Sequence, residues 1–343
     1  MEHCAIDLGG RKSQVCIRAS DGSIVHESRQ ETLQLGEFLR QRPTSRVVVE
    51  TSSEAFAIAD AARDAGHEVR VVSATLVKTL GVGARRLKTD RRDAQLLSEV
   101  SCRMDLPSVH VPKRESREVK SRCGMRQGLV RSRTQMINSI RGWLRGRGYR
   151  IRPGNAASFA QRVREIDQLP EYVASQLAVI DAVSLELRKA DKRIQQIAEA
   201  DPTCVRLMTV PGVGPQTALR FVAAVDEIQR FRDAHRLESY FGVVPGEKSS
   251  SDTQHRLSIT KAGSTTVRWL LLEAAWAVRT RCRSQEARPM QLWALEIEKR
   301  RGKHIATVAL ARKLAGILFA IWRDGTNYDC RRAALPSSSG AIA

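Results

Sequence analysis

The sequence predicts a fold in three parts: an α/β N-terminal domain, a long helical hairpin or coiled-coil arm, and a mainly α C-terminal domain. Short strand patterns separated by Gly9-Gly10 and Asp21-Gly22 turns begin the chain. Two long amphipathic patterns follow, on either side of Pro153-Gly154-Asn155, and compact helical patterns begin after Pro202. Because 343 residues exceed one domain of about 150, we expect divisions at 1–110, 111–200 and 201–330, with a mobile tail over 331–343.

The N-terminal part combines a strand meander with alternating helices and strands, which predicts an α/β sandwich. β-rich or alternating segments at 4–8, 13–18 and 23–27 predict the meander, and the apolar run RVVVE at 46–50 predicts a buried strand. We expect a further strand at 68–73 and helices at 33–40 and 54–65. The polar residues before an apolar pattern at 89–102 predict a helix that begins at Thr89 or Asp90.

Two long helices are expected in the middle of the chain, at 113–149 and 174–198. Their spacing predicts an antiparallel hairpin or a dimerisation arm. The apolar side of the first comprises Val119, Met125, Leu129, Met136, Ile140 and Leu144, and that of the second comprises Leu177, Ile180, Leu185, Leu187, Ile194 and Ile197. Shorter helices are expected at 217–225, 237–241, 265–279 and 305–322.

The charge of the chain indicates a polyanionic partner. Lys and Arg number 57 against 37 Asp and Glu, a net charge of +20, far beyond what solubility requires. A generally basic protein is the alternative, but the stretch 113–152 alone has a net charge of +11. The candidate nucleic-acid contacts in it are Lys113, Arg114, Arg117, Lys120, Arg122, Arg126, Arg131, Arg133, Arg141 and Arg145.

The seven cysteines are scattered and show no pair at the two-residue spacing of a zinc site, so we expect reduced thiols. No apolar run approaches the roughly 20 residues of a membrane span, which predicts a cytoplasmic protein with no membrane partner. His67, His110, His235, His255 and His304 are equally scattered, and we expect surface or packing positions for them.

Four carboxylates form a candidate metal site. Asp7 and Glu50 end predicted strands, while Asp90 and Asp93 lie three apart near a helix start, on one helical face. RNase H-like folds hold divalent metals in this way, and two magnesium ions would suit all-oxygen ligands and phosphoryl transfer. Singly, each has another explanation: residues 7–10 resemble the phosphate loop of actin-like ATPases, Glu50 suits a surface charge, and Asp90 suits a helix cap. Asp60 and Asp64 are expected to be solvated.

Residues 207–225 resemble a helix-hairpin-helix motif. Gly212 and Gly214 would free backbone N–H groups at a helix start to contact a DNA phosphate without reading sequence. An ordinary tight turn between helices is the alternative.

A serine triplet at 249–251 follows the Pro245-Gly246 turn. Such a run is typical of a flexible loop. Flanked by Lys248, Arg256 and Lys261, it equally suits a nucleophile beside cations that neutralise phosphate. Residue chemistry alone leaves both interpretations open.

The order of AIDLGG, VVVETSS, KTDRRDA, TVPGVGPQTA, FGVVPGEKSSSD and ITKAG over residues 3–325 resembles the insertion-sequence one-ten family of transposases. These DEDD recombinases are related to the Piv and MooV invertases and are RNA-guided bridge recombinases. The resemblance implies an RNase H-like (RuvC-like) domain in which Asp7, Glu50, Asp90 and Asp93 bind Mg²⁺, and a nucleophile at Ser250, or at Ser249 or Ser251 if the register shifts.

The resemblance further implies a covalent phosphoserine link to DNA and a noncoding guide (bridge) RNA that pairs with target and donor DNA. It implies a tetramer, a dimer of dimers, whose active sites combine the RuvC-like half of one protomer with the serine half of another. We therefore expect a bacterial, nucleoid-associated enzyme. Two alternatives remain: a metal-dependent Holliday-junction endonuclease without a covalent intermediate, and a non-enzymatic RNA- or DNA-binding scaffold.

Overall fold

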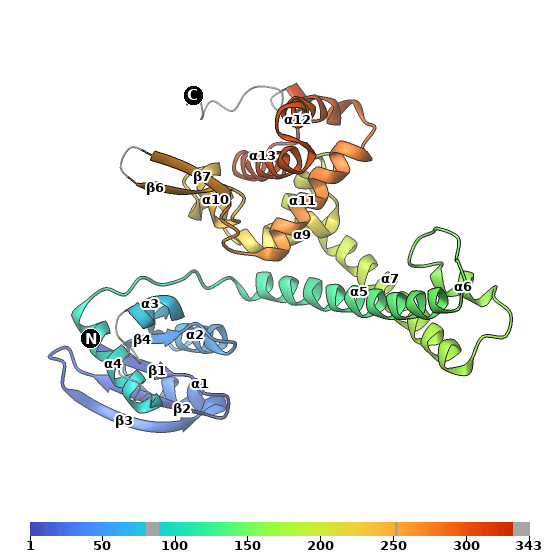
Figure 1. The fold of residues 1–343 in the computed structure, drawn as a ribbon. Helices are drawn as coiled ribbons and strands as arrows, with labels where there is room; N and C mark the ends of the chain where they lie inside the picture. The colour runs from blue at the N-terminus through green and yellow to red at the C-terminus, as the bar shows by residue number, and fades with distance from the viewer. Residues whose placement is uncertain (80–88, 251–252, 332–343) are drawn as a thin grey trace. The chain divides into compact units, whose positions relative to one another are not determined.

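A computed structural model describes residues 1–79, 89–250 and 253–331 (Figure 1). The chain divides into two compact units, Met1–Pro112 and Lys113–Ala343. The sequence-based division into 1–110, 111–200 and 201–330 stays a prediction. The first unit is an α/β domain with a mixed parallel and antiparallel sheet, and the second unit is mainly helical. The coarse fold class therefore agrees with the prediction.

The N-terminal sheet has the strand order β3-β2-β1-β4-β5. The expected meander is present, because β2 pairs antiparallel with both β1 and β3, whereas β4 pairs parallel with β1 and β5. The strands are β1 (Glu2–Asp7), β2 (Lys12–Arg18), β3 (Ile24–Glu31), β4 (Ser45–Glu50) and β5 (Glu68–Val72). All five lie within a few residues of the predicted positions.

Alternation along β1 and β4 sends successive side chains to opposite faces of the sheet. Cys4 and Ile6 pack in one apolar cluster with α1 (Leu35–Arg40) and α2 (Ala55–Asp64). Ala5 packs in another with α3 (Ala74–Thr79) and α4 (Asp90–Arg103). The two pairs of helices therefore cover opposite faces. A short 3₁₀ turn, η1 (Thr32–Gln34), precedes α1, and α3 had no counterpart in the predicted elements.

Polar contacts attach α4 to the sheet. The helix begins at Asp90, with Thr89 as the N-cap that accepts from the Arg92 N–H, as predicted for this segment. Ser98 Oγ lies 3.3 Å from Cys16 Sγ on β2. Near the other end of the helix, Ser101 Oγ is hydrogen-bonded to His3 Nδ1 on β1 at 2.8 Å. The order of these contacts shows that α4 runs antiparallel to β1.

The central arm pairs α5 (Arg114–Gly146) with α7 (Glu171–Ala200), and α6 (Phe159–Arg164) lies in their connection (Figure 1). The predicted hairpin is confirmed. Its predicted apolar sides are wrong at Met125 and Leu185, which are 75% and 45% exposed. Two cores explain this: Ile140 and Leu177 pack near the tip, whereas Cys123 and Ile194 join the C-terminal core.

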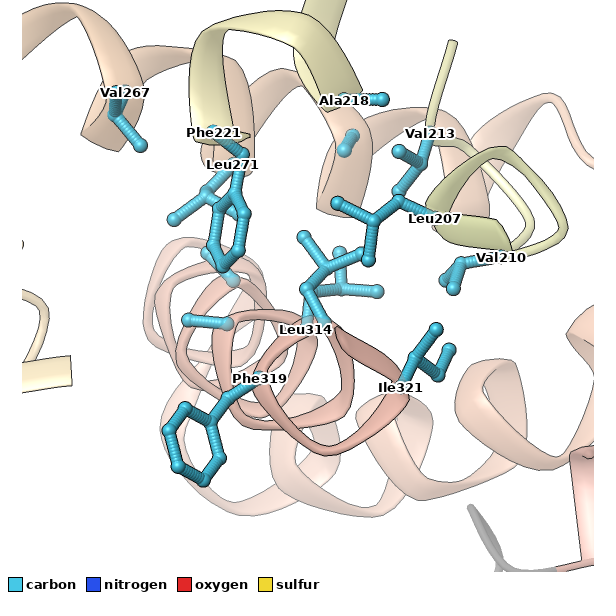
Figure 2. Close-up of a cluster of buried hydrophobic side chains, with 14 of the residues drawn as sticks. Leu207, Val210, Val213, Ala218, Phe221, Val267, Leu271, Leu314, Phe319 and Ile321 are labelled. Atoms are coloured by element: carbon cyan, nitrogen blue, oxygen red, sulfur yellow. The ribbon is translucent and has the colours of Figure 1, made fainter. Parts of the chain in front are cut away.

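The C-terminal helices surround one apolar core, in which Phe221, Leu271, Leu314 and Phe319 pack together (Figure 2). The helices are α8 (Pro202–Met208), α9 (Pro215–Val225), α10 (Ala234–Tyr240), α11 (Thr265–Thr280), α12 (Arg288–Arg301) and α13 (Lys303–Asp324), with 3₁₀ turns η2 (Ile228–Arg230) and η3 (Gln285–Ala287). α8 and α12 were not predicted. Among the described residues, α13 is the one helix long and apolar enough, by length and composition only, to cross a membrane; half of its most apolar stretch is buried, as in a core helix.

The serine-containing segment forms a two-stranded antiparallel sheet, β6 (Pro245–Ser250) and β7 (Thr253–Ile259). Of the two interpretations left open for the serine run, a flexible loop does not describe residues 249 and 250, whose backbone is paired with β7. Ser251 and most of the predicted tail, 332–343, lie outside the described residues. All seven cysteines are free thiols, as predicted.

His67 occupies a buried packing position, in agreement with the prediction for the histidines. Its Nε2 lies 2.9 Å from the Leu39 carbonyl oxygen, and its Nδ1 accepts from the Ser45 N–H at 3.1 Å. This pair of contacts requires the tautomer protonated on Nε2.

Candidate active site

Two of the four predicted carboxylates lie side by side at the carboxyl edge of the sheet. The parallel register pairs Ile6 with Val49, so Asp7 and Glu50 are the next residues on adjacent strands. Asp7 lies two residues after Ala5, and Glu50 lies two residues after Val48, so each points to the same face of the sheet as that residue. Ala5 and Val48 pack toward α3 and α4. Asp7 and Glu50 therefore lie on the face of the sheet that α4 covers.

The direction of α4 brings the other two carboxylates to the same edge. Ser98 is level with Cys16, the partner of Ala5 on β1. From there, two residues along β1 to Asp7 rise about 7 Å, and five residues back along α4 to Asp93 rise about 7.5 Å. Asp93 is only 9% exposed and lies four residues before the sheet-packing Leu97, so it is on the buried side of α4.

Asp90 is the first residue of α4 and is exposed. The interpretation of Asp90 as the helix cap is wrong, because Thr89 is the cap. Asp60 and Asp64 lie on α2, which packs against the opposite face of the sheet from α4. Asp64 is exposed, as expected, and Asp60 is half-buried.

The donor chemistry at this edge fits magnesium, which prefers oxygen ligands. Within the described ranges, however, no group of three or more His, Cys, Asp or Glu side chains is arranged so that it could hold an ion. The backbone thus places Asp7, Glu50 and Asp93 at one edge, whereas their side chains are not gathered into a cluster.

Hydroxyl groups that the sequence interpretation missed hold the two strand ends. After β1, the Gly9 carbonyl oxygen accepts from Thr32 Oγ1 at 2.7 Å, and Ser13 Oγ lies 2.8 Å from the same hydroxyl. After β4, the Thr51 N–H donates to the Val72 carbonyl at 2.9 Å. Thr51 Oγ1 also accepts from the Ala74 N–H at 3.2 Å, which ties Glu50 to the end of β5. The first of these turns includes Gly9 of the motif AIDLGG, and the second includes Thr51 of the motif VVVETSS.

The root of the β6–β7 hairpin is formed by two segments that pack directly on each other. The Lys261 N–H donates to the Gly242 carbonyl and the Thr260 N–H donates to the Val244 carbonyl, at 3.1 and 2.9 Å. Gly242 has a φ of +66°, and a Cβ there would collide with the backbone of Ala262. Only glycine allows this approach, so FGVVPG and ITKAG make one structural unit.

Arg268 on α11 joins both segments at the root, and the sequence interpretation missed it. Its side chain is buried, and Nη1 donates to the carbonyl oxygens of Phe241 at 2.9 Å and Ala262 at 2.7 Å. A charge-assisted bond to each segment holds the origin of the serine strand against α11. The sequence shows only an arginine five residues after ITKAG, and its burial and its two carbonyl partners are visible in the structure alone.

The hairpin register places the predicted nucleophile at the end of β6. Ser250 pairs with Thr253, Ser249 with Gln254, and Lys248 with His255. Arg256 pairs with Glu247, and Lys261 is exposed beyond the end of β7 with a φ of +57°. The choice among Ser249, Ser250 and Ser251 therefore remains a prediction.

Comparison with known proteins identifies the chain. The family model described as "Transposase IS116/IS110/IS902 family" matches residues 204–291, and a DEDD transposase model of IS110 type matches residues 4–147. A probable family 20 transposase of Pseudomonas aeruginosa is 30% identical over 304 residues, which cover 86% of this chain and 89% of the relative. The chain belongs to the IS110 family of transposases.

Two further relatives of the transposase are named for insertion sequences. The transposase for element IS1111A of Coxiella burnetii is 32% identical over 71% of this chain and 69% of its own length. The transposase for element IS1328 of Yersinia enterocolitica is 25% identical over 94% of this chain and 97% of its own. The match over residues 4–147 includes the strand-end carboxylates, and the match over residues 204–291 includes the hairpin with its root. As a transposase, the protein is an enzyme that cuts and rejoins DNA.

The predicted helix-hairpin-helix glycines of the transposase have different surroundings. Gly212 has a φ of +83°, and a Cβ there would lie 2.7 Å from the Ala274 carbonyl oxygen, so packing on α11 requires glycine. Gly214 is the N-cap of α9, and a Cβ there would meet open space. Packing thus accounts for Gly212 but not for Gly214, whose contact with phosphate stays a prediction.

The basic residues of α5 divide into two groups. Some have partners within the second unit: Lys113 pairs with Glu227 at 3.0 Å, and Arg126 pairs with Asp191 of α7 at 2.8 Å. Arg133 is half-buried near Ser184, and burial lowers the pKa of its guanidinium. The exposed members of the predicted set include Lys120, Arg131, Arg141 and Arg145. Arg126 links α5 to α7, a structural role that the charge count did not distinguish.

Proposed function

We propose that this IS110-family transposase is a DNA recombinase that uses an RNase H-like carboxylate site and a serine nucleophile. One observation carries the proposal: Asp7, Glu50 and Asp93 lie on the same side of the sheet at one edge, in a chain whose other family-matched half contains the serine strand. The strand order, with three antiparallel strands continued by two parallel ones, supports an RNase H-like assignment.

In this proposal Asp7, Glu50, Asp90 and Asp93 hold magnesium. Bound there, one or two ions would neutralise charge on a DNA phosphate and on the oxygens that attack and leave it. The protein contributes position: the paired strands set Asp7 beside Glu50, and packing of α4 sets Asp93 against the same edge. Asp90 and Asp93 both lie in the first turn of α4, where acidic side chains interact favourably with the positive end of the helix macrodipole.

The serine, which we assign to Ser250, attacks the phosphorus of a DNA phosphodiester. Its O–H proton passes to a base, a phosphorus–oxygen ester bond breaks, and the departing deoxyribose oxygen takes up a proton. A phosphoserine ester then links protein to DNA. A hydroxyl of the exchanged strand attacks that ester and releases the serine, so strands are rejoined without net hydrolysis.

The partners in the proposal are a noncoding bridge RNA and the target and donor DNA. A protein whose guide RNA reads the sequence needs mainly contacts to phosphate, and the exposed cations of α5 and the N-terminus of α9 suit that need. We propose a tetramer in which each site combines the RuvC-like half of one protomer with the serine half of another, because the family resemblance implies that arrangement.

The decisive experiment traps the covalent intermediate. The transposase, its RNA, Mg²⁺ and end-labelled DNA are combined, and the products are resolved on a denaturing gel. We expect a protein–DNA adduct that disappears with Ser250→Ala, while RNA and DNA binding is retained. Ser249→Ala is the matched neighbour and should keep the adduct.

Two other results would reject the proposal. Cleavage by Ser250→Ala, Ser249→Ala and Ser251→Ala alike, without an adduct, would support a Holliday-junction endonuclease that uses only the carboxylates and water. Unchanged function after combined Asp7→Ala and Asp93→Ala substitution would support a non-enzymatic scaffold.

A further inference from the structure

The tip of the arm contains a basic cavity. It lies between the end of α5, the loop that follows and the start of α6, and it has a volume of about 430 Å³. That volume is within the range of small-molecule sites. None of the described residues that line it is acidic, and five of them are arginines: Arg141, Arg145, Arg150, Arg152 and Arg162.

The positive charge of this cavity is not neutralised by the protein. Elsewhere on the arm, arginines pair with acids: Arg126 with Asp191 and Arg164 with Asp181. Within the described ranges, Arg145, Arg150 and Arg152 have no ion pair. Guanidinium groups gathered around one cavity repel each other, so the site favours an anionic occupant.

The cavity also has apolar and aromatic surfaces. Phe159 and Leu144 are buried beneath it, and the Arg141 guanidinium lies over the Phe159 ring at 5.5 Å. Tyr149 is 44% exposed at its edge. The occupant that matches both features has a planar apolar part and an anionic part.

Arg162 is built into the wall rather than free for a ligand. Its Nη2 donates to the Asn155 carbonyl at 3.1 Å, and Nη1 donates to Ser158 Oγ. Its bond to Asn155 therefore ties the end of the loop to α6. The other arginines of the cavity are exposed.

We propose that this cavity holds one unpaired nucleotide of a nucleic-acid strand, with its base against Tyr149 and its flanking phosphates on Arg145, Arg150 and Arg152. Aromatic stacking next to backbone cations is how proteins hold single strands, and a base can enter a recess only when it is out of a duplex stack. The inference rests on the proposed function only in its choice of a nucleic-acid partner. Most of the cavity lies outside the two family-matched segments.

The first test locates the base. The probe is a single-stranded RNA of about twelve nucleotides with one 5-iodouridine, and a second arm uses DNA with 5-iodo-2′-deoxyuridine. Irradiation of the complex with the full-length protein should give a cross-linked peptide that contains Tyr149. Tyr149→Phe should retain the cross-link. Tyr149→Ala should lose it and weaken binding about tenfold.

The second test locates the phosphates. Combined Arg150→Gln and Arg152→Gln substitution should weaken binding of the same strand about tenfold and reduce the salt slope by about one to two. Arg188→Gln with Arg193→Gln is the matched control: it removes the same charge from exposed positions of α7 and should have an effect under about threefold. The arm that cross-links more efficiently identifies RNA or DNA as the source of the nucleotide.

Three results would overturn the inference. These are cross-links that map away from the cavity, equal losses from the two double variants, or displacement of the strand from Tyr149 by polyglutamate at lower concentration than by unlabelled strand. The last would indicate an acidic protein partner. All measurements are of binding, so they hold whether or not Ser250 proves to be the nucleophile.

Discussion

The carboxylate edge and the serine hairpin are held in place by different means. Asp7 and Glu50 end strands inside a five-stranded sheet with helices packed on both faces. Ser250 ends a strand of a two-stranded sheet whose described attachment is its root, where Gly242 packs on Ala262 and Arg268 bonds to both segments.

The difference shows how much each position depends on a single contact. A five-stranded sheet with two apolar faces is stable as a unit, whereas an isolated two-stranded hairpin is marginally stable in water. The carboxylates thus depend on a whole core, and the serine strand depends on a few contacts near residues 241–268. Substitutions in the two regions should therefore fail in different ways.

The largest expected effect is the loss of one strand-end carboxylate. Asp7→Asn should reduce strand exchange about a thousandfold, because it removes a charged oxygen ligand, and should leave nucleic-acid affinity unchanged. Recombination between donor and target plasmids, measured over a magnesium titration, tests this. Asp64→Asn on the other face of the sheet is the control, and equal activity of the two variants would refute the role of Asp7.

Next in size is the packing of α4. Leu97 lies on the side of α4 that packs on the sheet and is 3% exposed. Leu97→Ala should therefore lower the unfolding free energy of the first unit by about 3 kcal/mol. Leu33→Ala, at a fully exposed leucine, should cost almost nothing. Urea unfolding of the full-length variants, monitored by hydrogen exchange in the first unit, compares their unfolding free energies. A small cost for Leu97→Ala would mean that α4 does not position Asp93 through this core.

The root of the hairpin should show a smaller stability effect with a local signature. Arg268→Met leaves the carbonyls of Phe241 and Ala262 without their donor, a cost of about 2 kcal/mol. Amide exchange in β6 and β7 should accelerate and the adduct yield should fall, with an unchanged magnesium requirement. Arg281→Met at the exposed end of α11 is the matched control. Slow exchange in the hairpin of Arg268→Met would contradict the clamp.

A still smaller effect is expected at the start of α4. Thr89→Ala removes the cap that accepts from the Arg92 N–H and should cost about 1 kcal/mol, whereas Thr89→Ser should retain most of the stability. Thermal unfolding of the three proteins gives the comparison. If serine and alanine are equally destabilising, the hydroxyl is not the stabilising group.

The smallest effect on stability at neutral pH involves the thiol of Cys4, which lies on β1 three residues before Asp7 and is buried in the core with α1 and α2. Burial raises the pKa of Cys4 from 9.0 to about 12, because the core disfavours the thiolate. Its contribution to stability is complete below pH 9 and is lost as pH rises toward 12, since the unfolded chain releases this proton first. Cys4→Ala should therefore flatten the alkaline decline in melting temperature. Parallel declines for both proteins would show that Cys4 is not responsible.

Local periodicity predicted much of this protein. The apolar segments CAI and VVV predicted both strands and placed Asp7 and Glu50 at their ends, and the Thr89 cap was visible as a residue type before an apolar pattern. Helical spacing also located α5, α7, α9, α11 and α13 to within a few residues. The candidate carboxylates and the serine segment were identified by residue type and order.

Other features could not be predicted because they depend on contacts between distant segments. The first four residues of β6, Pro-Gly-Glu-Lys, are of types depleted in strands. The strand forms because β7 and the root at Gly242 and Ala262 give it partners. Met125 and Leu185 belong to apolar patterns, but their exposure depends on which of two cores covers each part of the arm. The arginine cavity likewise joins α5, a loop and α6.

By itself, therefore, the sequence determined the kinds of elements, their order and the residues able to carry out chemistry, because these follow from spacing within short segments. Tertiary structure decided which face of the sheet α4 covers, which arginines are neutralised by acids and where the serine strand is anchored. Those outcomes depend on packing and hydrogen bonds between segments that are far apart in the chain.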